Sequence, residues 1–80
     1  MRYTTKGTCS MAIEYELDDE QRVRNVKFIG GCSGNTQGVA KLVEGMPAKE
    51  VINRLEGIKC GSRPTSCPDQ LATALKGSLS

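Results

Sequence analysis

The sequence contains no histidine and no tryptophan, and only one phenylalanine and two tyrosines among its 80 residues. Without histidine, a Ser-His-Asp triad and a mixed cysteine and histidine metal site are both excluded. The scarcity of large side chains also limits the core, because a chain this short buries only about 60% of the surface that its unfolded form exposes. We therefore predict a single domain, residues 1–80, that needs a metal or a disulfide to stabilise it.

Strong charge and long apolar runs are lacking as well. Lysine and arginine total 11 against 9 acidic residues, and a net charge of +2 is too small to indicate nucleic-acid binding. No stretch approaches the roughly 20 apolar residues that cross a bilayer, and the first residues have no apolar segment of signal-peptide length. We expect a cytoplasmic protein with no nucleic-acid or membrane partner, and the sequence leaves the oligomeric state open.

The sequence does contain four cysteines: Cys9, Cys32, Cys60 and Cys67. In a reducing cytosol such a set indicates metal binding or redox chemistry more often than structural disulfides. The alternative is that these cysteines are small buried apolar residues that only fill space.

The first third of the chain predicts a β-hairpin. Between residues 8 and 17 apolar and polar residues alternate, which is typical of a half-buried strand. The apolar face consists of Cys9, Met11, Ile13, Tyr15 and Leu17. The segment 23–29 is rich in β-branched and aromatic residues, and a tip at Asp19-Glu20 would place Ile13 opposite Val26 and Cys9 opposite Gly30.

The rest of the chain predicts about three helices. Asn35 or Thr36 can cap a first helix that ends at Gly45, and Pro47 suits the first turn of a second. The first helix has an apolar stripe at Val39, Leu42 and Val43. A third helix begins at Ser66-Cys67, with Ser66 and Asp69 in the positions of a capping box. Its apolar side consists of Leu71, Ala74 and Leu75, and we expect residues 77–80 to be a frayed tail. The fold class that follows is α+β, with an antiparallel β-hairpin or small sheet followed by about three helices packed on one face.

The cysteines are placed where they could act together. Cys67 lies at a helix N-terminus, where unpaired backbone N–H groups favour a thiolate. Cys60 precedes it by seven positions, and the glycines around Cys32 let the backbone pass close to a bound atom. With Cys9 there are four thiolates, the number that closes a Zn(II) site or holds an iron-sulfur cluster, although the spacing has no C-x-x-C knuckle.

The motif Thr65-Ser66-Cys67-Pro68-Asp69, the Gly-Gly-Cys-Ser-Gly-Asn loop at 30–35 and the Cys60-Gly61 turn together resemble the TSCPD domain family. The resemblance is to the free-standing four-cysteine type, related to the C-terminal domain of adenosylcobalamin-dependent ribonucleotide reductases. It implies that Cys9, Cys32, Cys60 and Cys67 are the characteristic cysteines. It also implies a role accessory to nucleotide reduction, with a ribonucleotide reductase or another redox protein as partner, but the chain is too short to be a complete reductase.

Four hypotheses follow. The first is a module that binds Zn(II) or an iron-sulfur cluster through the four cysteines. The second is a thiol/disulfide relay in which Cys60 and Cys67 cycle between dithiol and disulfide. The third is an iron-sulfur scaffold, suggested by the order of a hairpin, a glycine-flanked cysteine and helices, and the fourth is an interaction domain whose cysteines are packing residues.

Overall fold

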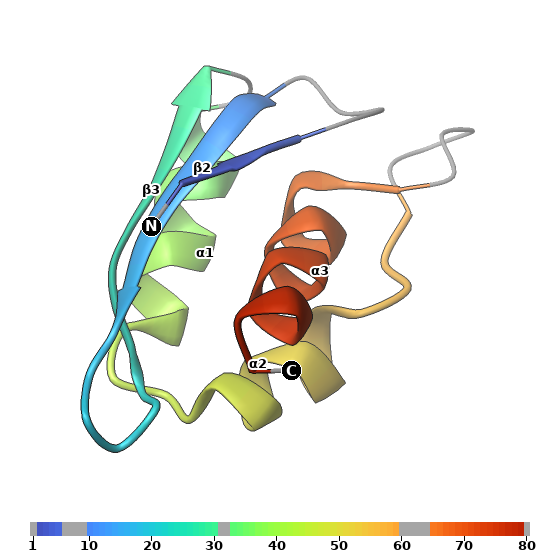
Figure 1. Cartoon of the computed structure of the whole chain (residues 1–80). Coiled ribbons are helices and arrows are strands. Elements are labelled where there is room, and N and C mark those ends of the chain that lie inside the picture. The colour runs from blue at the N-terminus through green and yellow to red at the C-terminus, as the bar shows by residue number, and fades with distance from the viewer. Residues whose placement is uncertain (1, 6–9, 31–32, 60–64, 80) are drawn as a thin grey trace.

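The structure, a computed structural model, describes residues 2–5, 10–30, 33–59 and 65–79. Its strands are β1 (Arg2–Thr4), β2 (Ser10–Leu17) and β3 (Val23–Gly30), and its helices are α1 (Ser33–Val43), α2 (Ala48–Leu55) and α3 (Cys67–Leu79). The strands form an antiparallel sheet in the order β1-β2-β3, and the helices lie to one side of it (Figure 1). The predicted α+β class is confirmed.

The strand β1 was not predicted from the sequence. It pairs with the free side of β2, with Tyr3 opposite Ile13, so β2 becomes the central strand. Three residues are too few to show a period of two, and the pairing depends on a neighbour ten positions away. Local pattern therefore could not reveal this strand.

The predicted hairpin is present, but its predicted register is wrong, by two residues in the central pairs and by one near the ends. Ile13 pairs with Phe28 instead of Val26, and Ser10 takes the place opposite Gly30 that Cys9 was expected to hold. The shift keeps the parity of the central pairs, so Ile13 and Tyr15 are still buried. Irregularities between Ser10 and Ala12 and between Glu14 and Glu16 change the alignment along the hairpin, and a tip guessed from composition cannot anticipate them.

The turn between β2 and β3 is organised by Asp18. Its Oδ1 accepts hydrogen bonds from the backbone N–H groups of Glu20 and Arg22, each at 2.9 Å, and its Oδ2 accepts one from Arg24 Nε at 3.2 Å. The N–H of Arg22 is the main cause that holds the pKa of Asp18 below its ordinary value of 3.8, and Arg24 and the N–H of Glu20 add to it. Asp18 is thus a structural residue of the turn.

The lowered pKa makes the hairpin sensitive to acid. Because the folded state favours the charged carboxylate, the stabilisation by Asp18 is present above its unfolded pKa and is lost as the pH falls through the lower, folded pKa. We expect Asp18→Asn to be less stable than the wild type at neutral pH, and the two proteins to converge in stability as the pH falls through the lowered pKa of Asp18. Urea unfolding midpoints measured across this range check it, and a difference that is independent of pH would contradict it.

The connection between α1 and α2 lies against the start of β3. Val23 N–H donates to the carbonyl of Met46 at 2.8 Å, and Gly45 N–H donates to the carbonyl of Val23 at 2.7 Å. Gly45 has a φ of +80°, a left-handed conformation that glycine adopts without strain, so the predicted helix end there is confirmed. These bonds fix the start of α2 relative to the sheet.

Two helix boundaries differ from their predictions. Helix α1 begins at Ser33, earlier than a cap at Asn35 or Thr36 would place it. Helix α3 continues to Leu79, through the segment expected to fray. The last turn of α3 is held because Tyr15 hydroxyl bonds both the carbonyl of Ala74, at 3.2 Å, and the hydroxyl of Ser78.

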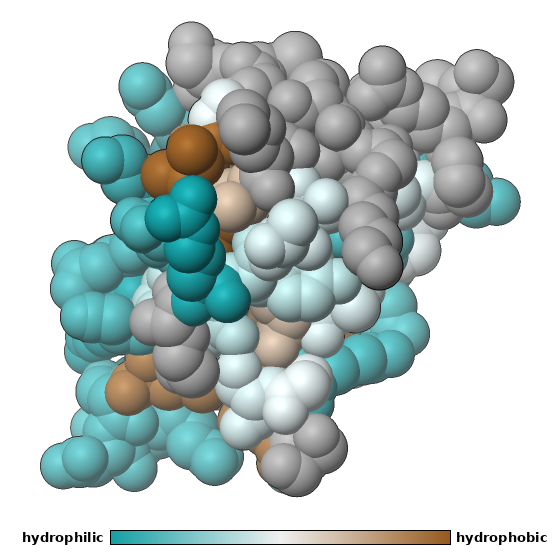
Figure 2. Space-filling view, turned by 45° about the horizontal axis from the view of Figure 1, so that its top comes forward, coloured by the Kyte–Doolittle hydropathy of each residue, from teal (hydrophilic) through white to brown (hydrophobic). Residues whose placement is uncertain are grey.

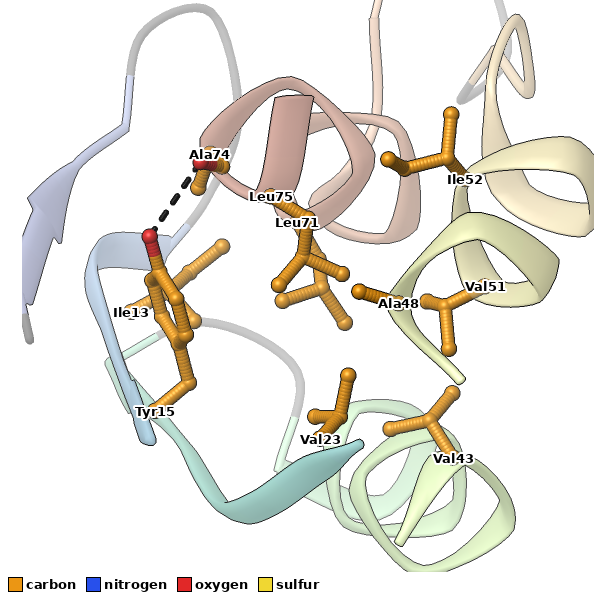
Figure 3. Packing of buried hydrophobic residues seen from close by; sticks show 10 residues of the cluster. All are labelled: Ile13, Tyr15, Val23, Val43, Ala48, Val51, Ile52, Leu71, Ala74 and Leu75. Carbon is orange, nitrogen blue, oxygen red and sulfur yellow. Dashed lines mark hydrogen bonds between the residues drawn. The ribbon is translucent and has the colours of Figure 1, made fainter. Parts of the chain in front are cut away.

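The core lies between β2, the start of β3 and the helices, and Figure 3 shows its side chains pointing toward one another. Its members are Ile13, Tyr15, Val23, Val43, Ala48, Val51, Ile52, Leu71, Ala74 and Leu75. The predicted apolar side of α3 is confirmed. Leu42 is an exception, since it was expected on the buried stripe of α1 but is 78% exposed.

Candidate functional site

Of the four predicted site cysteines, the structure describes Cys67. It is the first residue of α3, as predicted, and only 9% of it is exposed. Cys9, Cys32 and Cys60 lie outside the described residues, so their convergence on one site stays a prediction. Within residues 2–5, 10–30, 33–59 and 65–79, no group of three or more His, Cys, Asp or Glu side chains could hold a metal ion.

The described residues next to Cys9, Cys32 and Cys67 lie toward the same end of the molecule. Ser10, which follows Cys9, pairs with Gly30, two residues before Cys32. The N-terminus of α1 and that of α3 both point to this end, which is the upper end in Figure 1. Figure 2 tilts this end toward the viewer, and in the middle of the face below it the described surface is weakly polar and is flanked by hydrophilic side chains.

The start of α3 is built by Ser66. Its Oγ accepts a hydrogen bond from the backbone N–H of Asp69 at 3.2 Å, which caps one of the unpaired N–H groups of the first turn. The same hydroxyl donates to the carbonyl of Ile58 at 2.6 Å. One serine therefore fixes where α3 begins and holds the segment after α2 against it, which sets the position of Cys67.

Asp69 forms the second connection between these segments. Its carboxylate accepts a hydrogen bond from the backbone N–H of Gly57 at 2.7 Å and another from the hydroxyl of Thr65. Gln70 Nε2 donates to Thr65 Oγ1 at 3.0 Å. The predicted capping box is thus present in its serine half, whereas the acidic residue reaches back to the end of α2 and to Thr65.

These contacts give the Thr65–Asp69 motif a physical explanation. Two hydroxyls and one carboxylate hold the backbone of residues 57–58 and 65–66 against the first turn of α3, and Pro68 suits that turn because a proline there sacrifices no helical hydrogen bond. The thiol of Cys67 is the group in the motif whose chemistry suits a soft metal. Lys59, in the segment before this helix start, is exposed.

Sequence reasoning singled out Cys67 and the cap at Ser66 but missed the roles of Thr65 and Gly57. The spacing of Thr65 and Asp69, four residues apart across a helix start, is a signal for a local hydrogen bond. The bond from Gly57 spans 12 residues and depends on how α2 packs on α3, so the sequence gives no local sign of it.

The fold and the helix start define a small α+β domain in which a motif of hydroxyls and a carboxylate positions a cysteine. The model of the TSCPD domain matches residues 1–79, so this chain belongs to the TSCPD domain family. That membership supports the relation to the C-terminal domains of ribonucleotide reductases. Neither the curated proteins nor the solved structures contain a match to this chain.

No helix in the described part of the chain is both long and apolar enough to span a membrane.

Proposed function

We propose that the protein is a small module that binds Zn(II) or an iron-sulfur cluster through Cys9, Cys32, Cys60 and Cys67. The observation that carries the proposal is the arrangement of the described residues beside three of these cysteines, Cys9, Cys32 and Cys67. The paired Ser10 and Gly30 and the starts of α1 and α3 all face one end of the molecule.

The chemistry of the site supports a metal. Four thiolates suit a tetrahedral Zn(II) ion and also an iron-sulfur cluster, because zinc and cluster iron are both commonly bound by cysteine sulfur. Cys67 lies at the N-terminus of α3, the end of a helix that carries a positive partial charge. A bound metal would also link segments far apart in the sequence and so stabilise a domain with few large side chains.

The relation to reductase C-terminal domains suggests the setting in which the module works. We propose an accessory role in nucleotide reduction, with a ribonucleotide reductase or another redox protein as partner, in the cytoplasm. A thiol/disulfide relay through Cys60 and Cys67 is the competing function. The burial of Cys67 favours the metal over the relay, because thiol exchange needs access to the sulfur.

The test is metal analysis of protein purified without chelators. We expect about one zinc ion, or the iron and sulfide of one cluster, per chain, and each single Cys→Ser variant to lose at least about nine-tenths of it. Thr73→Ala, an exposed change on α3, is the matched control that keeps the metal. Metal-free protein with four reactive thiols and no rise in Tm on adding Zn(II) or reconstituting a cluster would overturn the proposal, and a reversible Cys60–Cys67 disulfide would favour the relay.

A further inference from the structure

The first turn of α3, which carries Cys67, is held by four polar side chains that we call the helix-start network. They are Thr65, Ser66, Asp69 and Gln70. Ser66 is 5% exposed and Gln70 is 8% exposed, so two of the four are buried. Buried polar groups cost free energy unless they are paired, and every buried side-chain nitrogen or oxygen of the described residues has a hydrogen-bond partner.

The helix-start network joins the beginning of α3 to the chain that leaves α2. Ser66 Oγ donates to the carbonyl of Ile58 at 2.6 Å. The carboxylate of Asp69 accepts from the N–H of Gly57 at 2.7 Å and from the hydroxyl of Thr65. Figure 1 shows the chain after α2 running beside α3 toward the start of that helix. The first turn of α3 is therefore tied to α2, whose buried side belongs to the core.

A helix cap alone does not need these connections. One N-cap oxygen satisfies an N–H group of the first turn, and Ser66 Oγ does so for Asp69 N–H at 3.2 Å. The bonds to residues 57, 58 and 65 satisfy no further N–H group of α3. What they add is restraint, because helix ends fray when nothing holds them, and Cys67 lies in the turn that would fray.

We infer that the helix-start network is a positioning device for Cys67, which holds the thiol in one buried place before any metal arrives. A mobile ligand loses conformational entropy when a metal fixes it, whereas a ligand that is already held loses less. Ser66 and Asp69 thereby raise the affinity of the site for its metal although they are not ligands. This effect on affinity rests on the proposed function, but the positioning of the thiol does not.

Alkylation of Cys67 by iodoacetamide in chelator-treated protein tests the positioning. A buried thiol reacts when the structure opens around it, and mass spectrometry of the digested protein reports Cys67 apart from the other cysteines. We expect Ser66→Ala to react at least about tenfold faster than the wild type, because both the cap and the bond to Ile58 are lost. Asp69→Asn, which keeps one acceptor oxygen, should react faster by a smaller factor, and Ser66→Thr, which keeps the hydroxyl, should react as slowly as the wild type.

Ile13→Val is the matched control, because it destabilises the fold from β2 without touching the helix-start network. Ile13 is fully buried, so the loss of one methyl group leaves a cavity in the core. Local opening of the first turn does not depend on the stability of the sheet, and we expect alkylation of Cys67 in Ile13→Val to stay within about twofold of the wild type. Circular dichroism and urea unfolding verify that each variant is folded and measure its stability.

Two alkylation results would overturn the positioning of Cys67. One is a rate in Ser66→Ala that equals the rate in the wild type. The other is a set of rates that follows the loss of stability alike in Ser66→Ala and Ile13→Val, because Cys67 would then be reached through global unfolding and the network would be only structural.

Competition with a chelating dye measures the Kd for Zn(II) and tests the effect on affinity. We expect Kd to rise at least about fivefold in Ser66→Ala and to stay unchanged in Ile13→Val. Equal Kd values in the wild type and Ser66→Ala would overturn the role in metal affinity and leave the metal site itself in place. A chain that binds neither Zn(II) nor a cluster would contradict the proposed function, and the alkylation rates would still decide whether the network positions Cys67.

Discussion

Leu71→Ala is expected to lower the free energy of unfolding by about 2–5 kcal/mol, the usual cost of truncating a fully buried leucine. Leu71 is 0% exposed and points from α3 into the core between β2 and α2 (Figure 3). A domain of this size has about 4–12 kcal/mol in total, so the loss is a large fraction of its stability. Urea unfolding followed by circular dichroism measures the change.

The control for this prediction is the same substitution at an exposed position. Leu42→Ala removes the same atoms from a side chain that is already 78% exposed, and it should change the monomer's stability by no more than about 0.5 kcal/mol. Equal losses in the two variants would mean that Leu71 is not a core residue. The comparison is made at low protein concentration so that association does not contribute.

Asp69→Ala is expected to cost about 1–3 kcal/mol, because it removes hydrogen bonds between a carboxylate and both Gly57 N–H and the Thr65 hydroxyl. It also removes a negative charge from the first turn of α3, where the helix dipole favours one. Asp69→Asn should lose less, since one acceptor oxygen remains. Chemical denaturation measures the stabilities of the wild type, Asp69→Asn and Asp69→Ala, which we expect to decrease in that order.

Asp19→Ala is the matched control for this second prediction, because it removes the same side chain from the exposed tip of the hairpin. We expect its stability to match that of the wild type within about 0.5 kcal/mol. If Asp69→Ala were as neutral as Asp19→Ala, the connection between α2 and α3 would not contribute to stability. A metal content reduced in Asp69→Ala but not in Asp19→Ala would further connect the helix start with the proposed site.

The parts of the fold that the sequence predicted are those set by local pattern. The alternation around Ile13 and Tyr15 identified a strand face, and the apolar spacing of Leu71 and Leu75 identified the buried side of a helix. What it could not predict depends on distant partners. The strand β1, the register of the hairpin and the last turn of α3 all rely on contacts with β2 that no short window contains.

For the candidate site too, the features set by local sequence could be predicted and those set by packing could not. The helix start at Cys67 and its cap follow from the order of residues 66–69, because a serine before a proline-containing first turn is a local signal. The bond from Gly57 to Asp69 required the packing of α2 against α3. The role of the four cysteines as a set remains a prediction from their number and chemistry.

The irregularity in the hairpin has a consequence for solubility. Asn25 has a φ of +55°, its N–H donates to Glu44 Oε1 at 2.9 Å, and it interrupts the pairing of β3, an edge strand that also carries the exposed Lys27. A kinked strand with a lysine on it is a poor template for another chain to extend the sheet. The free edge of the sheet at β3 is therefore poorly suited to aggregation by strand addition.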